Sequence, residues 1–285
     1  MPPRAKWPLA LLTVALLISV TASGVLLSSN AQLQSERNAA STRLQMTTAL
    51  GEGQMAVQDQ ISRLNELVTG LSVNCTQLGL NGTALRAQIN ATMAADGCIL
   101  SMITFDARGI VIAAEPASNH FMEGIDLSYS DNIARSLATK RPFMSDVLQP
   151  LHGPPGVALD IPVFDTAGVF QGGVSAFYSI SALMNGTLPT LSVGMPFTWW
   201  SMQLNGTEIY DTDPAQIGQN NLGPATDPFP QAKALSWRVV NESYGYGSYS
   251  FFVNLDAQQV VTKECYWSTV GLHGTQWRLT IVHRL

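Results

Sequence analysis

The sequence predicts an α+β protein: an N-terminal transmembrane helix and a long stalk helix, followed by two modules that each contain an antiparallel sheet. Three observations support this prediction. An uncharged apolar run of 21 residues covers Trp7–Leu27. A polar stretch without proline, Asn30–Val73, has apolar residues at helical spacing. From Cys98 onward, strand-like runs alternate with Gly, Pro and Asn turn signals, which is typical of antiparallel sheets.

The apolar run at the N-terminus has the length that a membrane-spanning helix needs, about 20 residues. Arg4 and Lys6 precede it, so the positive-inside rule places Met1 in the cytoplasm and the rest of the chain outside. The small residues at 21–24 also resemble a signal-peptide cleavage region, but the length of the run favours an uncleaved anchor. We therefore expect a single-pass protein of the cell membrane whose bulk is extracytoplasmic.

Six Asn-x-Ser/Thr sequons agree with an exported chain, because a glycosylated sequon lies on the surface of a secreted or extracellular region. Six is more than the Asn, Ser and Thr content would give by chance, although polar turns rich in these residues are the alternative explanation. The candidate glycosylation sites are Asn74, Asn81, Asn90, Asn185, Asn205 and Asn241.

The chain has three cysteines. Cys75 and Cys98 flank a helix-like segment, so they are a candidate disulfide in an oxidising compartment. Cys265 is left over, and its Tyr-Trp neighbours suggest a buried strand thiol. Because the chain has no Cys-x-x-Cys motif and its four histidines are dispersed, no metal site is expected.

The stretch after the anchor carries one apolar helix stripe. Its members recur at spacings of three and four residues: Val57, Ile61, Leu64, Val68 and Leu71. Such a stripe either packs along a following domain or forms the seam of a homodimer through the stalk helix. The predicted domains are the cytoplasmic tip and anchor at 1–29, the stalk and its connection at 30–84, and the two modules at 85–188 and 189–285.

The pentad Phe-Asp-x-x-Gly occurs twice in the first module, at residues 105–109 and 164–168. It predicts two hairpin tips, in which the Phe points into the core, the Asp accepts backbone N–H groups and the Gly adopts a positive φ. This interpretation is favoured over a duplicated ligand loop or a metal site. The expected elements are helices at 85–97 and 131–141 and strands at 98–106, 109–116, 143–151, 157–165 and 168–180.

The second module starts again with a hairpin, and Asn205-Gly206 forms its tip. Three more strands are expected within 248–255 and 263–285, after a loop at 214–231 that is rich in Pro, Gly and Asn. Asp211 and Asp213 could bind calcium, but their surroundings lack the Gly and distal Glu of an EF-hand loop, so an Asp-rich turn is favoured. Trp199 and Trp200 could line a second pocket, although their alternation favours simple packing.

The segment "GIDLSYSDNIARSLATKRPFMSDV" at 124–147, followed by "VALDIPVFDTAGVFQGGVSAFYSI" at 157–180, carries a family resemblance. Together with the closing "GTQWRLTIV", it resembles the double Cache domain, a tandem PAS-like extracytoplasmic sensory module of bacterial and archaeal receptors. The resemblance covers about residues 32–285. It implies two PAS-like modules, of which the first is membrane-distal and the second membrane-proximal.

The resemblance also implies a small-molecule ligand, often an amino acid, another carboxylate or an amine. The ligand would lie in the membrane-distal module, between the sheet and the helix that follows the first hairpin. The amino-acid-binding version has an Arg, a Trp and a Tyr on that helix and an Asp on the last strand. Here Ser130 stands where the Arg would be, Asn132 and Ile133 replace the aromatics, and Phe177-Tyr178 replace the Asp. The usual α-amino-acid motif is therefore absent.

Eight residues remain as candidates for lining this pocket, through aromatic walls, hydrogen bonds or charge. They are Tyr129, Asp131, Arg135, Phe143, Ser145, Asp160, Phe177 and Tyr178. Core packing is the alternative for the aromatics, helix capping for Asp131, and solvent exposure for Arg135.

No catalytic motif such as Gly-x-Ser-x-Gly or His-Glu-x-x-His occurs, so no enzyme activity and no cofactor are expected. The net charge of -5 and the lack of a dense Lys/Arg face indicate no nucleic-acid partner. We expect a membrane-anchored extracytoplasmic sensing or binding module without its own cytoplasmic output domain. Such a module hands its signal to a separate partner, captures a solute, or is a sensor that has lost its output. The alternative is a cell-surface structural or adhesive glycoprotein that uses the same scaffold without a ligand.

Overall fold

The computed structural model describes residues 7–150 and 153–285, and it describes side chains in the N-terminal helix from residue 27 onward. The chain divides into two compact units, Met1–Thr48 and Ala49–Leu285. Within the described residues, no helix has both the length and the apolar character that a membrane span requires. The expected anchor at Trp7–Leu27 falls almost entirely on residues whose side chains lie outside the description, and it remains a prediction.

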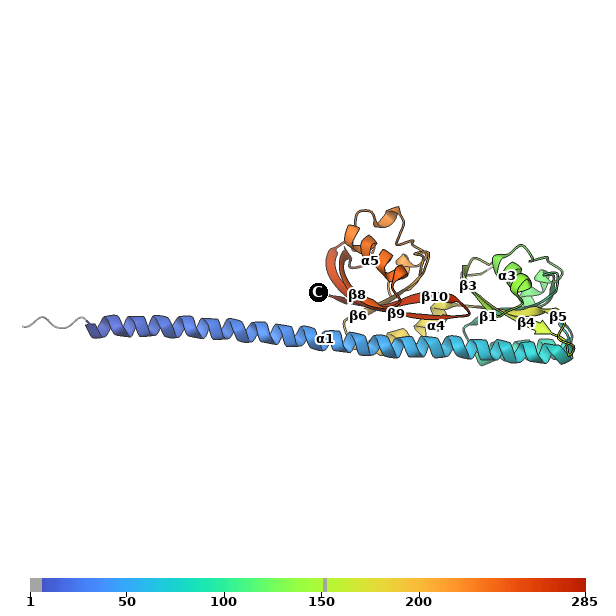
Figure 1. Cartoon of the computed structure of the whole chain (residues 1–285), viewed down its shortest axis with the longest axis horizontal. Helices are drawn as coiled ribbons and strands as arrows, with labels where there is room; N and C mark the ends of the chain where they lie inside the picture. Colours follow the sequence, from blue (N-terminus) through green and yellow to red (C-terminus); the bar gives the residue numbers. More distant parts are fainter. Residues whose placement is uncertain (1–6, 151–152) are drawn as a thin grey trace, which may run out of the picture. The chain divides into compact units, whose positions relative to one another are not determined.

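The larger unit contains two five-stranded antiparallel sheets with the same strand order (Figure 1). The first sheet has the order β2-β1-β5-β4-β3, and the second has the order β7-β6-β10-β9-β8. The strands of the first sheet are β1 (Ile99–Asp106), β2 (Val111–Glu115), β3 (Phe143–Leu148), β4 (Gly156–Phe164) and β5 (Phe170–Tyr178). Those of the second are β6 (Phe197–Gln203), β7 (Glu208–Asp211), β8 (Gly245–Phe252), β9 (Val260–Leu272) and β10 (Thr275–Arg284). This confirms the predicted pair of antiparallel-sheet modules.

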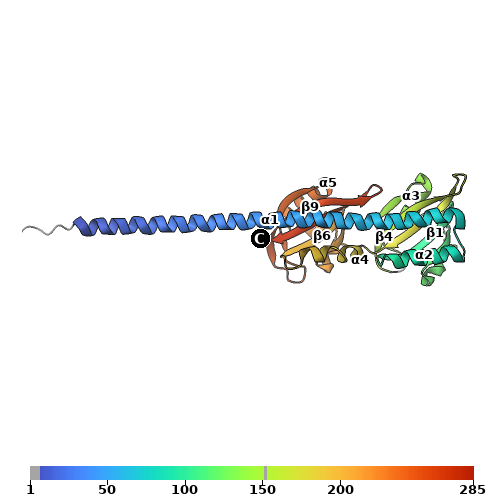
Figure 2. The ribbon, with the colours of Figure 1, turned by 90° about the horizontal axis from the view of Figure 1, so that it is seen from below.

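Helices cover both faces of each sheet. The helices are α1 (Trp7–Leu78), α2 (Thr83–Ala95), α3 (Asp131–Thr139), α4 (Ile180–Asn185) and α5 (Pro230–Asn241). Four short 3-10 helices complete the list: η1 (Ala117–Met122), η2 (Leu188–Ser192), η3 (Pro214–Gln216) and η4 (Pro224–Thr226). Figure 1 shows α3 and α5 on the sheet faces that point away from α1, and Figure 2 shows α1 running across the opposite faces.

The apolar stripe of α1 packs inside the larger unit. All five predicted members of the stripe, from Val57 to Leu71, are at most 2% exposed. Polar neighbours on the same helix bond the second sheet, because Gln54 Nε2 donates to the carbonyl of Thr269 over 2.9 Å and Gln58 Nε2 donates to that of Gly271 over 3.0 Å. Of the two predicted roles, packing along a domain is therefore the one observed. These five side chains cannot also form the seam of a homodimer.

One glycine in α1 is required by a close approach of the second sheet. A Cβ on Gly53 would lie 2.9 Å from the ring of Trp199 and 3.2 Å from the side chain of Leu188. Trp199 is 1% exposed, so its ring cannot move into solvent without opening the core. Trp199 is thus a packing residue between β6 and α1.

The Phe-Asp-x-x-Gly pentads form the two hairpin tips that the sequence predicts. Asp106 Oδ1 accepts from the N–H groups of residues 108 and 110, and Asp165 Oδ1 accepts from those of 167 and 169. Gly109 and Gly168 have φ values of 89° and 79°, a conformation that favours glycine. The prediction of structural turns is confirmed.

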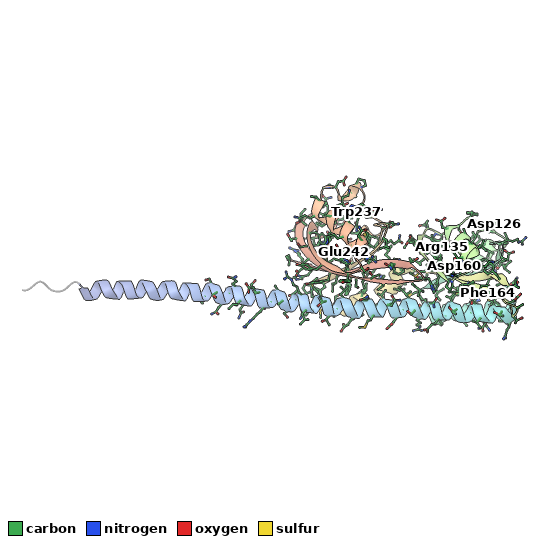
Figure 3. All side chains as sticks on the ribbon, viewed as in Figure 1. Asp126, Arg135, Asp160, Phe164, Trp237 and Glu242 are labelled. Atoms are coloured by element: carbon green, nitrogen blue, oxygen red, sulfur yellow. The ribbon has the colours of Figure 1, made fainter. Side chains whose placement is uncertain are left out.

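The expectation that both pentad phenylalanines are core residues is wrong for the second one. Phe105 is fully buried, whereas Phe164 is 36% exposed and packs edge-on against Phe170 with ring centroids 5.8 Å apart. A register shift between Val163 and Phe164 turns the second phenylalanine away from the core face. Figure 3 shows Phe164 at the end of the sheet, where its carbonyl accepts a hydrogen bond from Thr76 of α1.

The predicted disulfide between Cys75 and Cys98 is wrong, since the structure holds both as buried free thiols. Gln60 Nε2 lies 3.9 Å from the sulfur of Cys98. Gln60 and Cys75 are both on α1, and a helix rises 1.5 Å per residue, so the two thiols lie about 20 Å apart along its axis. A disulfide needs Cα atoms within about 7 Å. Cys265 is fully buried in β9, as predicted.

All six sequon asparagines have exposed side chains. Surface exposure is a requirement for glycosylation, so the sites remain candidates. Helix α5, by contrast, was not predicted. The Pro- and Gly-rich stretch before it obscured its start at Pro230, although Ala232, Leu235 and Val239 follow a helical spacing and are all buried.

Candidate functional site

A cavity of about 480 Å³ lies in the first module, and we refer to it as the first cavity. Its walls come from β1, η1, the segment before α3, the first turn of α3, the loop after β3, and strands β4 and β5. The first cavity thus lies between the sheet and the helix after the first hairpin. Six of its lining residues are Ile103, Leu127, Tyr129, Asn132, Ser175 and Phe177.

Alternation along the strands determines which side chains line the first cavity. Ile103 on β1 pairs with Ser175 on β5, and Ala158 on β4 pairs with Phe177. Paired residues share a face of the sheet, so these four side chains all point toward α3. The intervening residues Val174 and Ala176 point to the opposite face, where they are buried.

The structure brings only two of the eight sequence candidates to the cavity. Phe177 forms part of its wall, and Tyr129, 73% exposed, stands at its edge. Tyr178 points to the other face of the sheet, where its hydroxyl donates to the sulfur of Met144 over 3.0 Å. Ser145 is buried beside β4, and its hydroxyl oxygen accepts from the N–H of Ala158 over 2.9 Å.

The charged candidates on α3 lie on its exposed face. Asp131 and Arg135 are exposed, whereas Asn132, Ile133 and Ser136 form the buried face of the helix. The guanidinium carbon of Arg135 lies 4.4 Å from the ring centroid of Phe143, so Arg135 and Phe143 contact each other rather than a ligand in the cavity. Figure 3 shows Arg135 and Asp160 on the same side of the first sheet.

Asp160 lies behind the cavity wall and is completely buried. It accepts from Asn132 Nδ2 over 3.1 Å and also bonds Ser175, which faces it across the β4–β5 pair. Burial raises the pKa of Asp160 to about 7, and the hydrogen bonds from Ser175 and Asn132 offset only part of that rise. Asn132 and Ser175 line the cavity, so the two residues connect the buried carboxyl to it.

A charged cluster fixes the η1 wall of the first cavity. Arg86 on α2 donates to Glu115 Oε1 over 3.1 Å and to Glu123 Oε1 over 2.7 Å. His120 Nε2 lies 3.3 Å from the same Glu115 oxygen. Burial is the largest single influence and opposes ionisation of Glu115 and Glu123, but the hydrogen bonds that they accept, from Arg86 first, and the nearby positive charge together outweigh it and lower the pKa of both. The two glutamates flank η1, so the cluster holds both ends of this wall.

Sequence reasoning missed the uncharged part of the site. Asn132 and Ser130 are at positions where the resemblance places an aromatic and an Arg, and both line the cavity. Ser130 Oγ donates to the carbonyl of Leu127 over 2.8 Å. The helical phase of α3 could have identified Asn132. Ile133, the most apolar residue near the start of the helix, marks its buried face, and Asn132 is adjacent to it in the sequence. Within the ranges 7–150 and 153–285, no charged side chain lines the first cavity.

Comparisons with known proteins indicate the type of domain that this chain resembles. Residues 59–179 match the family model described as "HK/GC/Chemotaxis protein-like, sensor domain". No curated protein matches the chain. The solved structures that match have the double Cache fold, which agrees with the resemblance seen in the sequence.

Three solved structures illustrate the likeness. An extracellular ligand binding receptor from Desulfohalobium retbaense is 23% identical, with a TM-score of 0.71 over 84% of this chain and 40% of that one. The sensory domain of the Campylobacter jejuni chemoreceptor Tlp3 is 13% identical, with a TM-score of 0.61 over 88% and 96% of the two chains. The ligand binding domain of the Pseudomonas aeruginosa amino acid chemoreceptor PctB, in complex with L-Gln, is 15% identical, with a TM-score of 0.59 over 84% and 89%. The chain thus spans less than half of the Desulfohalobium receptor.

Proposed function

We propose that this chain is an extracytoplasmic sensor module that binds an uncharged small molecule in the first cavity. The observation that carries the proposal is the cavity itself, about 480 Å³ in volume and without a charged side chain on the walls that the structure describes. A carboxylate or ammonium group that enters such a space loses its water without gaining a counter-charge, which is unfavourable. A volume of this size is typical of small-molecule sites.

The walls indicate the chemistry of the ligand. Ile103, Leu127 and Phe177 provide apolar surface, and Asn132 and Ser175 provide hydrogen-bonding groups on one side. A compact neutral molecule with an amide, a hydroxyl group or a ring nitrogen fits this combination. The amine or carboxylate that the resemblance implies lacks a partner here, and so does an α-amino acid.

We also propose that Trp7–Leu27 anchors the module and that the bulk of the chain is extracytoplasmic. The exposed sequon asparagines and the sensor-domain match support this location. N-terminal sequencing of the mature protein tests the anchor, because a start at Met1 or residue 2 supports it and a start after residue 24 contradicts it. A glycosidase-sensitive shift in mass tests the sequons.

A thermal-shift screen of the purified full chain tests the ligand proposal, because a ligand that binds the native state raises the unfolding temperature. The panel has a neutral arm of purines, pyrimidines, amides and alcohols, and a charged arm of amines, carboxylates and amino acids. We expect stabilisation from the neutral arm. Stabilisation by the charged arm alone, or by no compound on well-folded protein, contradicts the proposal. The second outcome favours the structural glycoprotein.

A cavity-filling variant shows whether a stabilising compound uses this site. Ser101 lines the cavity and is only partly buried, so Ser101→Leu occupies space without overpacking the core. Ser181→Leu makes the same change on the exposed surface of α4 and serves as the matched control. We expect Ser101→Leu to remove the stabilisation and Ser181→Leu to retain it.

A further inference from the structure

The second module contains its own cavity, about 340 Å³ in volume, which we call the second cavity. Trp200 on β6 and Val282 on β10 line it, and so do Leu235 and Ser236 on α5. It lies between the second sheet and the helix that covers it, as the first cavity does in its module. Trp200, Tyr249 and Phe251 give it aromatic walls.

Unlike the first cavity, the second has an acidic wall. Glu208 and Asp211 of β7 both line it. A register shift in the β6–β7 pair places Glu208 opposite Met202 and Asp211 opposite Trp200, so the bulge brings both carboxyls to one face. Glu208 is only 3% exposed.

One oxygen of Glu208 has no donor other than the neighbouring acid. Asn221 Nδ2 donates to its Oε2 over 2.6 Å, whereas its Oε1 is buried without an amide, hydroxyl or cationic donor among the described residues, and the carboxyl of Asp211 lies beside Glu208. No Lys, Arg or His of the described chain forms an ion pair with Glu208 or Asp211. Burial raises the pKa of Glu208, and the neighbouring Asp211 raises it further. The two carboxyls therefore hold a proton more readily than isolated carboxyls do, and a bound cation could take the place of that proton.

The fold itself does not require these acids. The first module has the same strand order and the same bulge, and its ladder pairs Phe105 with Val111 and Ile103 with Ala114. Val111 and Ala114 follow Gly109 by two and five residues, as Glu208 and Asp211 follow Gly206. Equivalent positions thus hold an apolar pair in one module and an acidic pair in the other.

The remaining charged groups at the second cavity form no ion pair with the two acids, although the positive charge of Lys263 lowers the pKa of both. Asp213 is engaged with the backbone, since its Oδ1 accepts from the N–H of Ala215 and its Oδ2 from that of Leu255. Lys263 also lines the cavity, but its Nζ lies 3.5 Å from the carbonyl of Val253 and 5.8 Å from the ring centroid of Phe251. No cluster of His, Cys, Asp and Glu in the described chain could hold a metal ion.

We propose that the second cavity binds an organic cation, with the ammonium group of the ligand between Glu208 and Asp211 and its apolar body against Trp200, Tyr249 and Phe251. A desolvated ammonium gains two charge-assisted hydrogen bonds from the acids, and aromatic faces attract the cation further. The chain then has two sites of opposite selectivity, one in each module.

Benzylamine is the probe for this proposal, and benzyl alcohol is its uncharged analogue of similar shape. The comparison uses the full chain with Ser101→Leu, in which the first cavity is filled. In this variant we expect benzylamine to raise the unfolding temperature in a saturable way, and benzyl alcohol at the same concentrations to have no comparable effect. Equal effects of the two compounds, or no effect of benzylamine, would overturn the proposal. Calorimetry then gives the dissociation constant.

The first module supplies the variant that separates binding from folding. The double substitution Glu208→Val, Asp211→Ala installs the pair that the equivalent strand already carries, so we expect it to fold. Its affinity for benzylamine should fall at least tenfold. Asp256→Asn removes a charge on the exposed surface of the same module and should leave the affinity unchanged. Retained binding in the folded double variant would overturn the proposal.

Lys263 provides a second, independent test. Lys263→Met removes the one cation that lines the second cavity among the described residues. We expect benzylamine to bind this variant more tightly, because the competing positive charge is gone. Weaker binding would mean that Lys263 helps to build the site, which contradicts the proposal. The Ser101→Leu variant should not affect benzylamine, so failure here and failure of the first site are distinguishable.

Discussion

The two modules have the same sheet and hairpin geometry, but they place polar residues at different positions of it. Glu208 and Asp211 of the second module replace the apolar Val111 and Ala114 of the first. Conversely, Asp160 of the first module corresponds to Trp267 of the second, because each pairs with the central strand at the equivalent position. We propose that the scaffold sets where a cavity lies and that a few ladder positions set which ligand the cavity accepts.

Asp160→Asn has the largest effect that we expect. The folded-state pKa of Asp160 is about 7, well above its ordinary value of 3.8. Between these values the native state binds the proton more tightly than the unfolded state, so the wild type loses stability as pH rises from about 4 to about 7. An Asn does not titrate.

The free energy of unfolding of Asp160→Asn should therefore increase relative to that of the wild type as the pH rises through this window, by up to about 4 kcal/mol above pH 7. Denaturant unfolding at pH 4, 5, 6, 7 and 8 measures the difference. A difference that does not change with pH would show that Asp160 is not the buried titrating group that distinguishes the first module.

Arg278→Met tests how the second module holds its helix. Arg278 of β10 is 3% exposed, and its guanidinium donates to the carbonyls of Val239, Val240 and Glu242 at the end of α5. The substitution leaves these carbonyls without their donor, which destabilises the fold by about 3 kcal/mol. Arg284→Met on the exposed end of the same strand is the control and should change stability little. Equal losses in the two variants would contradict this role.

Asn132→Leu tests whether the polar wall of the first cavity contributes to ligand binding. It removes the hydrogen-bonding group that lines the cavity and contacts Asp160. The affinity for the neutral compound that the screen selects should fall roughly tenfold, the equivalent of one hydrogen bond. Benzylamine affinity should stay the same, because the second cavity is untouched. Calorimetry with both compounds measures this, and a loss of both affinities would point to a general folding defect.

Tyr129→Ala has the smallest expected effect. The side chain is 73% exposed at the edge of the first cavity, so stability should change by less than about 0.5 kcal/mol. Binding of the neutral compound should weaken a few-fold through loss of an aromatic contact. Tyr244→Ala, at a tyrosine of the second module that is 80% exposed, is the matched control. An equal response in both variants would remove Tyr129 from the site.

The sequence predicted the sheets and their turns well, because local chemistry determines them. The Asp and Gly of each pentad close a hairpin through their own backbone contacts, so Asp106 and Asp165 could be assigned without tertiary information. The apolar stripe from Val57 to Leu71 likewise predicted a buried helix face. Phe164 was misplaced because a register shift depends on pairing with β5, which the local pattern does not contain.

The sequence predicted where the candidate site lies better than it predicted which residues line it. Asp131 and Arg135 were predicted to contact the ligand because they are charged. In the structure, however, Asn132 and Ile133 lie on the buried face of α3 instead. Two residues of a helix that are adjacent in sequence differ by about 100° around its axis, so an error of one position turns a cavity residue into a surface residue. Of the acidic pair of the second module, the sequence singled out only Asp211, together with Asp213 in an Asp-rich turn, because the bulge that aligns Glu208 with Asp211 is a property of the folded ladder.

Crystallography of the full chain with the selected neutral compound and benzylamine tests the central claim most directly. The account predicts the neutral compound in the first cavity, in contact with Asn132, Ser175 and Phe177. It predicts the ammonium of benzylamine between Glu208 and Asp211 in the second. An empty first cavity, with the neutral compound bound in the second module or on the surface, would contradict the claim that the first module is the site of an uncharged ligand.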